Sequence, residues 1–359
     1  MLRVLVAEDS ATARLLIVSL LSSDPEITVV GQARNGEEAV AMCAQLRPDV
    51  VTMDLQMPVM DGLEATRQIV SASQTPVIVV SSLDPAETTK SMLAFNAGAL
   101  AVLAKPAGPG TPRFEKDCLE LISTVKALSE HAAVAAAAAP EAAEPVAPVT
   151  PGSALPVTDA TGEVAAPIEI IGVVAATGGP IALRAFFKAL PSKSAAPVLI
   201  VQHIAMGFTK SFANWLQTAT DRAVRLAVDQ EPITPGTVYV APDDRHLGVH
   251  EGVITVTSGP AIDGARPSGT ALLASLAKAY AAKAAGVLLT GNGSDGVEGL
   301  RQLRDAGGAV FAQDQASCTT FETPRIAIEQ GIVTKGRPVA EISHRIGNRV
   351  AGKPEHAKH

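Results

Sequence analysis

Short apolar runs alternate with segments of helical periodicity through the first third of the chain, and few folds accommodate such an order. Successive β and α segments of this kind predict a five-stranded parallel sheet with helices on both faces, a doubly wound α/β domain. The strand-like runs cover residues 2–7, 27–31, 49–53, 76–81 and 100–104, and the helical segments lie near 11–22, 36–46, 62–71, 85–97 and 112–128.

A change of composition follows this domain. Residues 129–167 are rich in Ala, Pro, Glu, Val and Thr, so they cannot bury enough apolar surface to offset the entropy of ordering them. We therefore predict domains at 1–128 and 168–350, joined by an extended linker and followed by a polar tail at 351–359. A length of 359 residues agrees with two domains. The second domain repeats strand, glycine turn and helix, which predicts another doubly wound, mostly parallel α/β fold with an antiparallel β insert around 224–258.

Charge and cysteine content exclude several function classes. The formal net charge is −7, so the chain has no overall attraction for a nucleic acid backbone or an anionic lipid surface. Its three cysteines stand far apart without CxxC or Cys/His spacing, which indicates neither a disulfide framework nor a zinc site. We find no secretory signal pattern and no apolar run long enough to span a membrane. We expect a cytoplasmic protein with no nucleic acid partner and no membrane insertion.

Charged and hydroxyl side chains follow the predicted strands of the first domain. Glu8 and Asp9 come after the first strand, Asp54 after the third, Ser81 after the fourth and Lys105 after the fifth. Because the carboxyl ends of parallel strands form one crevice, these side chains are expected to converge. Three crowded carboxylates repel one another unless a cation joins them, and oxygen ligands of this kind suit Mg²⁺. With Mg²⁺ and an ammonium group screening the charge, a carboxylate can accept a phosphoryl group.

The motifs at these positions resemble the receiver domain of two-component response regulators, which has a flavodoxin-like fold. They read EDS at 8–10, MDLQMPVMDG at 53–62, VSS at 80–82 and AKP at 104–106. One departure is Val102, which stands where many receivers carry an aromatic switch residue. The resemblance assigns Asp54 as the phosphoacceptor, Ser81 and Lys105 as sensors of the phosphoryl oxygens, and Glu8, Asp9, Asp54 and the Gln56 backbone carbonyl as Mg²⁺ ligands.

Three motifs in the second domain follow predicted strands in the same way. They read VVAATGGP at 173–180, VQHI at 201–204 and LTGNGSDG at 289–296. An acyl-transfer site needs a nucleophile, a general base, an acid that orients the base, and oxyanion donors, and converging strand ends can supply them. The segments resemble the methylesterase domain of the chemotaxis protein-glutamate methylesterase family, whose motifs read GASTGGP, VQHMP and LTGMGxDG.

This resemblance implies that His203 is the general base and that Asp295 orients it, whereas Ala176 stands where the family carries its serine nucleophile. A methyl group cannot attack a carbonyl carbon. In a serine protease, loss of the nucleophile lowers turnover by about 10⁶-fold, which is roughly 8 kcal/mol of activation barrier. The resemblance implies no cofactor in this domain, and it assigns three further residues to the oxyanion position and the cleft, namely Thr177, Gly178 and Asn292.

The sequence leaves alternatives to an inactive site open. Thr177 could serve as the nucleophile, although neighbouring residues in a strand or turn point elsewhere. A serine of another loop could reach His203, and Ala176 could be an introduced substitution. The candidate serines are Ser268, Ser294 and Ser317. Four companion departures from the family pattern argue against an introduced change: Asn292 for methionine, Ala205 for proline, Trp215 for an arginine of the cleft, and RPSGT at 266–270 for RPSVD.

Two functions follow from these observations. In the first, phosphorylation of Asp54 by a chemotaxis sensor histidine kinase shifts the domain interface, and the second domain demethylates glutamate methyl esters of methyl-accepting chemoreceptors or deamidates their glutamines. In the second, the same fold binds receptors or the kinase without chemistry, because Ala176 replaces the nucleophile. A DNA-binding regulator would need a basic recognition element after the linker, and the sequence contains none.

Overall fold

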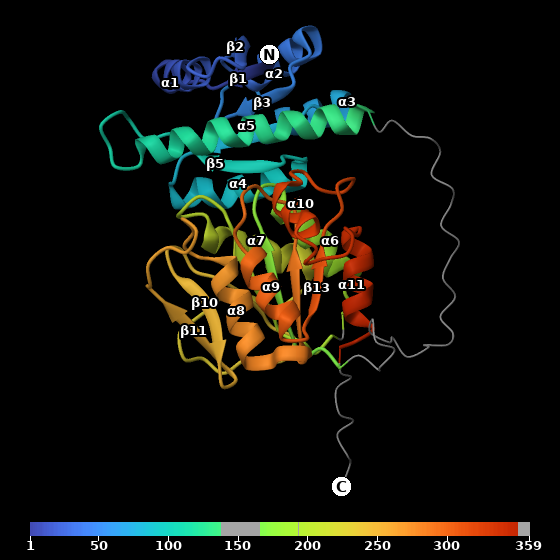
Figure 1. Cartoon of the computed structure of the whole chain (residues 1–359). Helices are drawn as coiled ribbons and strands as arrows, with labels where there is room; N and C mark the ends of the chain where they lie inside the picture. Colours follow the sequence, from blue (N-terminus) through green and yellow to red (C-terminus); the bar gives the residue numbers. More distant parts are fainter. Residues whose placement is uncertain (138–165, 193, 351–359) are drawn as a thin grey trace.

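A computed structural model of the chain describes residues 1–137, 166–192 and 194–350 (Figure 1). Most of the predicted linker, and the predicted tail at 351–359, lie outside these ranges. Two parallel sheets and one antiparallel pair form the sheet structure of the described residues. The α/β class expected for both halves is confirmed.

The N-terminal sheet has the strand order β2-β1-β3-β4-β5, and all neighbouring strands are parallel. Every position of β3 and β4 is buried, because helices cover both faces, and this explains why these strands read as continuous apolar runs. The strands are β1 (Leu2–Ala7), β2 (Ile27–Ala33), β3 (Val50–Met53), β4 (Val77–Ser81) and β5 (Ala101–Ala104).

Apolar clusters on the two faces of this sheet hold its helices. One cluster joins α1 and α5 to the sheet, and another joins α2 and α3. The helices are α1 (Ala11–Ser22), α2 (Gly36–Leu46), α3 (Gly62–Ser73), α4 (Pro85–Ala97) and α5 (Phe114–Ala137). The predicted end of the last helix near residue 128 is wrong, since α5 continues to Ala137. Alanine favours helix, so the Ala-rich start of the predicted linker extends α5.

The C-terminal sheet has the order β13-β12-β6-β7-β9-β8, and its neighbouring strands are parallel. Only part of the expected antiparallel insert has that geometry. β8 and β9 run parallel and extend the main sheet, whereas β10 and β11 form the antiparallel pair. The strands are β6 (Ile170–Ala175), β7 (Val198–Gln202), β8 (Val224–Leu226), β9 (Val238–Val240), β10 (His246–His250), β11 (Val253–Thr257), β12 (Ala284–Leu288) and β13 (Ala309–Ala312).

Helices cover both faces of the C-terminal sheet as well. One apolar cluster contains side chains of α8 and α9, and another contains those of α6, α7 and α11. The helices are α6 (Gly179–Ala189), α7 (Thr209–Thr220), α8 (Gly269–Tyr280), α9 (Val297–Asp305), α10 (Glu322–Glu329) and α11 (Val339–Gly347), with a 3-10 turn η1 (Ala281–Lys283) after α8.

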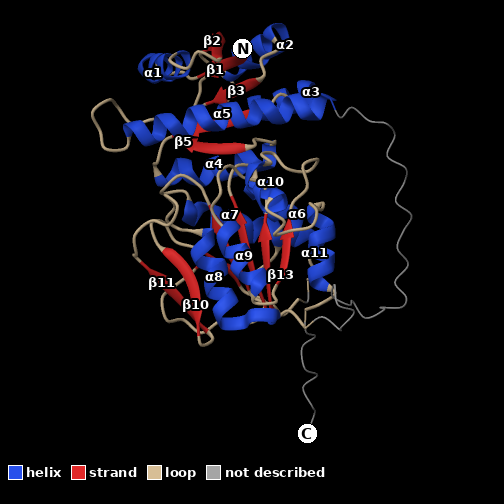
Figure 2. Cartoon of the chain, viewed as in Figure 1, coloured by secondary structure: helices blue, strands red, loops and turns tan. Residues whose placement is uncertain are grey.

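The two domains are stacked, with α4, β5 and α5 of the first above the second (Figure 1). The arrow of β13 points toward the first domain, so the carboxyl ends of the C-terminal strands face it (Figure 2). Buried residues of α4 belong to the same apolar cluster as those of α6 and α7. None of the helices in the described ranges is long and apolar enough to cross a membrane.

Candidate functional site

The acidic cluster predicted for the first domain forms at the carboxyl ends of its strands. One ligand oxygen each of Glu8, Asp9 and Asp54 lies within 4.8 Å of the others. Lys105, directly after β5, places its Nζ 2.9 Å from Glu8 Oε2 and 3.0 Å from Asp54 Oδ2. Glu8 and Asp54 are buried, and Asp9 is exposed. Solvent therefore reaches the cluster on the side of Asp9.

The carboxylates of this cluster carry more negative charge than the Lys105 ammonium can balance, and burial makes that charge more costly. Burial raises the pKa of the Asp54 carboxyl, although Lys105 opposes the shift. Burial and the nearby Asp54 charge raise the pKa of Glu8. For Lys105, burial lowers the pKa, but the two carboxylates outweigh this and raise it. A divalent cation with a preference for oxygen would relieve the repulsion, so the donor set fits Mg²⁺.

The Ser81 side chain has its hydrogen-bond partner on α4. Its hydroxyl, which is fully buried, donates to Glu87 Oε2 on α4 at 3.4 Å. Its carbonyl accepts from the Lys105 backbone N–H at 2.7 Å, so the ends of β4 and β5 are joined. Gln56 lies in the loop after β3, where its backbone N–H donates to Asp54.

The turn after β6 carries Ala176, the residue at the position where the resemblance predicts a nucleophile. Ala176 lies next to Gly291, where an added Cβ would come within 2.8 Å of the Ala176 Cβ. Gly178 has a φ of +79° and begins α6, and an added Cβ there would meet the Thr319 hydroxyl at 2.3 Å. Both close approaches require glycine. The first-turn N–H groups of α6 therefore lie at the turn that carries Ala176.

His203 and Asp295 form the expected pair. His203 Nε2 lies 2.8 Å from Asp295 Oδ2, and both follow strands of the C-terminal sheet. The N-terminus of α8 also holds the carboxylate: the Ser268 hydroxyl donates at 2.7 Å, the Gly269 N–H at 2.5 Å and the Thr270 N–H at 3.1 Å. Burial raises the pKa of Asp295, but the hydrogen bonds from His203, Gly269 and Ser268 outweigh it and hold the pKa below its usual range.

Three of the four candidate replacement hydroxyls already have other partners, and Ser294 is the exception. Ser268 caps α8 by accepting from the Ala271 N–H while it donates to Asp295. The Thr177 hydroxyl donates to the Asn292 side chain at 3.2 Å, and the Ser317 hydroxyl bonds Asp314. Ser294 is exposed and lines the cleft. Ser268 was one of the possible nucleophiles, but its position as an N-cap beside an acid explains why a serine stands there.

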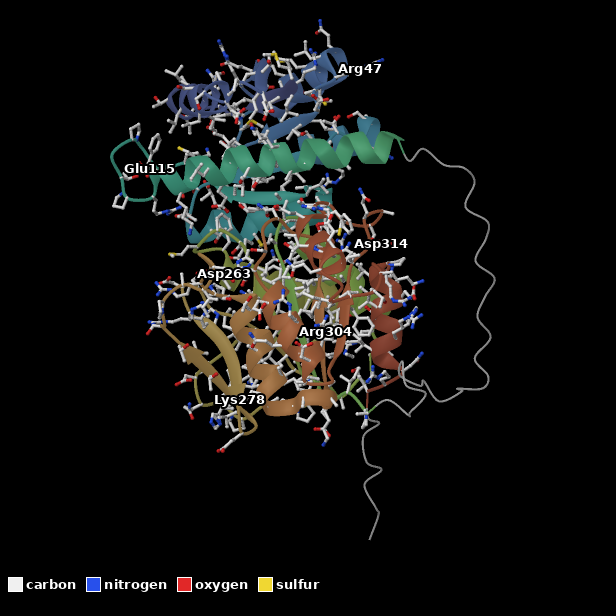
Figure 3. All side chains as sticks on the ribbon, viewed as in Figure 1. Arg47, Glu115, Asp263, Lys278, Arg304 and Asp314 are labelled. Atoms are coloured by element: carbon white, nitrogen blue, oxygen red, sulfur yellow. The ribbon has the colours of Figure 1, made fainter. Side chains whose placement is uncertain are left out.

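A cleft of about 950 Å³ contains this site, and the first domain forms one of its walls. The second domain contributes Ala176, His203 and Asp295, with Thr177, Gly178, Ala205 and Asn292. The first domain contributes residues of β5, including Val102, and the first turns of α5. Figure 3 labels two lining residues of opposite walls, Glu115 at the start of α5 and Asp263 in a loop below it.

A contact between α4 and α7 holds the two domains together beside the cleft. Asn96 Oδ1 accepts from Arg184 Nη1 at 3.2 Å and from Trp215 Nε1 at 3.3 Å. The Trp215 ring contacts Phe95 of α4 and Phe212 of α7, with ring centroids 5.4 and 6.2 Å away. The expectation that Trp215 occupies the cleft is wrong: it is buried in the domain interface. No sequence motif indicated this contact.

Two family descriptions match the chain. Residues 171–346 match CheB methylesterase, and residues 4–111 match the response regulator receiver domain. The protein-glutamate methylesterase/protein-glutamine glutaminase 3 of Anaeromyxobacter dehalogenans (strain 2CP-C) is 50% identical over 339 residues, covering 92% of this chain and 94% of that protein. The protein-glutamate methylesterase/protein-glutamine glutaminase 4 of Myxococcus xanthus (strain DK1622) is 45% identical over 352 residues, covering 98% of each. The CheB methylesterase catalytic domain of Thermotoga maritima, a crystal structure, is 34% identical with a TM-score of 0.49, and the match covers 51% of this chain and 99% of that one.

Proposed function

This chain belongs to the CheB methylesterase family and pairs that domain with a response regulator receiver domain, and from this premise we propose that it is a chemotaxis response regulator acting in sensory adaptation. Phosphorylation of Asp54 by a chemotaxis sensor histidine kinase controls access to the cleft. The substrates of that cleft are glutamate methyl esters, and glutamines, of methyl-accepting chemoreceptors. The protein works in the cytoplasm without entering the membrane or binding nucleic acid.

One observation carries the gating: the receiver domain forms a wall of the cleft that contains His203 and Asp295. In this proposal α5 and β5, which line part of the cleft, restrict the approach of a receptor helix to these side chains. A phosphoryl group adds negative charge to the Asp54 cluster and changes the balance of contacts around Ser81 and Lys105. A change of a few kcal/mol in favour of another receiver conformation would be enough to open the interface.

The receiver residues have separate tasks in phosphorylation. Glu8, Asp9, Asp54 and the Gln56 carbonyl hold Mg²⁺, which when bound screens the charges of the approaching phosphoryl group. Asp54 Oδ attacks the phosphorus of the kinase's phosphohistidine, the P–N bond breaks, the kinase histidine leaves as the neutral imidazole, and Asp54 keeps the phosphoryl group as an acyl phosphate. Lys105, already 3.0 Å from Asp54, neutralises charge there, and Ser81 contacts a phosphoryl oxygen after its hydroxyl turns from Glu87.

A second candidate function is a phosphorylation-gated binding protein of the same family, and Ala176 favours it. His203 is oriented by Asp295 as a general base would be, but the adjacent methyl group offers no proton to take and no oxygen to attack. The hydroxyls of Thr177, Ser268 and Ser317 have other partners. In this second function the cleft binds receptor side chains without hydrolysing them.

Methanol release from methylated receptor membranes distinguishes the two. The full-length protein and Ala176→Ser are compared with and without Mg²⁺ and acetyl phosphate, with Ala176→Ser/His203→Ala as the control for chemistry at this site. Turnover by both the unmodified protein and Ala176→Ser supports the hydrolase and a nucleophile other than residue 176. Phosphodonor-dependent turnover by Ala176→Ser alone supports the binding protein, and no turnover by either form contradicts the assignment of the cleft.

A further inference from the structure

The segment between β4 and α4 is held by a single carboxylate. Glu87 Oε2 accepts from the Ser81 hydroxyl at 3.4 Å and from the Ser82 N–H at 3.1 Å, and the Ser82 hydroxyl donates to the same oxygen. Ser81 is fully buried, and Ser82 is half-buried. Hydrogen bonds to a charged acceptor in partly buried surroundings are stronger than neutral ones. The carboxylate therefore bonds both serines on the side of α4, and the long Ser81 contact is the weaker of the two and the easier to exchange.

Glu87 is not needed to start the helix. α4 begins with Asp84, whose side chain accepts from the Ala86 N–H at 2.9 Å, and with Pro85 in its first turn. These two features already provide the usual cap and the usual first-turn residue. The bonds of Glu87 point out of the helix toward the Ser81–Ser82 segment, so its main effect is on the position of that segment.

The hydroxyl that Glu87 holds is the one that a phosphoryl group on Asp54 requires. Ser81 ends β4, next to the end of β3 that carries Asp54, and its carbonyl bonds the N–H of Lys105. To reach a phosphoryl oxygen, the Ser81 hydroxyl must leave Glu87. We propose that Glu87 is a resting-state latch that competes with the aspartyl phosphate for the Ser81–Ser82 segment and so sets how readily the receiver switches.

The same segment touches the second domain, which gives the latch a route to the cleft. Leu83 packs against Gly207, where an added Cβ would lie 3.4 Å from Leu83 Cδ2. Gly207 belongs to the loop that begins at His203 and leads into α7. One turn further along α4, the Thr88 hydroxyl lies 3.1 Å from that of Ser211. Release of the latch therefore changes contacts with the loop that carries the general base. The aromatic relay position, Val102, is not needed for this route.

The latch rests on the proposed phosphorylation of Asp54, and a direct binding measurement separates the two. Beryllofluoride with Mg²⁺ mimics an aspartyl phosphate, and ¹⁹F NMR resolves its bound and free forms without reference to enzyme activity. Full-length wild type, Glu87→Ala, Glu87→Gln and Asp54→Asn are titrated. The matched control is Glu64→Ala, because Glu64 also lies in the first turn of a helix, α3, but bonds only its own helix through Arg67 and Gln68.

The latch predicts that Glu87→Ala reaches half-saturation at a concentration about fivefold to tenfold lower than wild type, since competing hydrogen bonds to a charged group are lost. Glu87→Gln, which keeps an acceptor oxygen without the charge, falls between them and serves if Glu87→Ala folds poorly. Glu64→Ala matches wild type. Unchanged or weaker binding by both Glu87 variants overturns the latch while the proposed phosphorylation stands. Absence of binding by wild type overturns the phosphorylation itself, and the latch with it.

Discussion

The Phe95 ring of α4 and the Trp215 ring of α7 meet across the domain interface, with centroids 5.4 Å apart and planes tilted by 54°. Tilted aromatic pairs at this distance contribute about 0.5–1.5 kcal/mol beyond the area that they bury. The contact joins the receiver to the helix that follows the His203 loop. Any movement of α4 that separates the domains must break it.

Trp215 is the single tryptophan of the chain, so its fluorescence reports this contact without labelling. Buried indole emits at shorter wavelength than indole in water. We expect the emission of full-length protein to shift to longer wavelength when beryllofluoride and Mg²⁺ are added together, and not with either alone. Asp54→Asn should show no shift. An emission spectrum that stays constant while beryllofluoride is bound would mean that the α4–α7 contact survives activation.

Asn96 is expected to stabilise the docked domains through its side-chain oxygen. Asn96→Ala leaves the buried Trp215 N–H without its acceptor, which costs about 1–3 kcal/mol. Urea denaturation followed by Trp215 emission should therefore give a lower midpoint. The control is Asn214→Ala, an exposed neighbour of Trp215 on α7, for which we expect a change within about 0.5 kcal/mol. Equal midpoints for the two variants would contradict a role of Asn96 in docking.

The Asp295 carboxylate should make the C-terminal domain sensitive to acid. Its pKa in the folded protein is below the ordinary value of 3.8, so its contribution to stability is present above about pH 4 and is lost as the pH falls through the folded pKa. Asp295→Asn should lower the unfolding free energy at pH 7 by about 1–3 kcal/mol, and the difference from wild type should shrink below pH 4. The control, Asp263→Asn, changes an exposed acid of the same cleft. A difference that grows on acidification would reverse the sign of this assignment.

The acidic cluster should reduce the stability of the receiver domain when no metal is bound. Glu8 and Asp54 both have raised pKa values, because burial and, for Glu8, the Asp54 charge disfavour ionisation. Asp54→Asn removes one of the charges, so we expect its melting temperature in EDTA to exceed that of wild type by about 2–4 °C. Mg²⁺ should stabilise wild type more than the variant. Glu37→Gln, an exposed acid on α2, is the control; a lower melting temperature for Asp54→Asn in EDTA would contradict net repulsion.

Local sequence patterns account for much of the fold. The periodicity of apolar residues predicts the order of strands and helices in the first domain, and in the structure Ser10, Asn35 and Asp61 cap α1, α2 and α3. Strand ends that carry Glu8, Asp54 and Lys105 converge because parallel strands share one carboxyl edge. The pairing of His203 with Asp295 follows from the same rule in the second domain.

Contacts between distant segments could not be predicted from the sequence, because no local pattern shows which distant residue a side chain will contact. The run of alanines that suggested a linker continues α5, because alanine has the highest helix propensity of the amino acids. The β8 segment pairs in parallel with β9 rather than in a hairpin, because both strands extend the main sheet. Trp215 lies under α4, and Ser268 supports Asp295, only because the folded chain brings these helices and loops together. The sequence by itself determined the two α/β domains, the residues at their strand ends and the alanine at position 176. Only the tertiary structure decided that the receiver forms one wall of the cleft, because packing between domains depends on surfaces assembled from many separate segments.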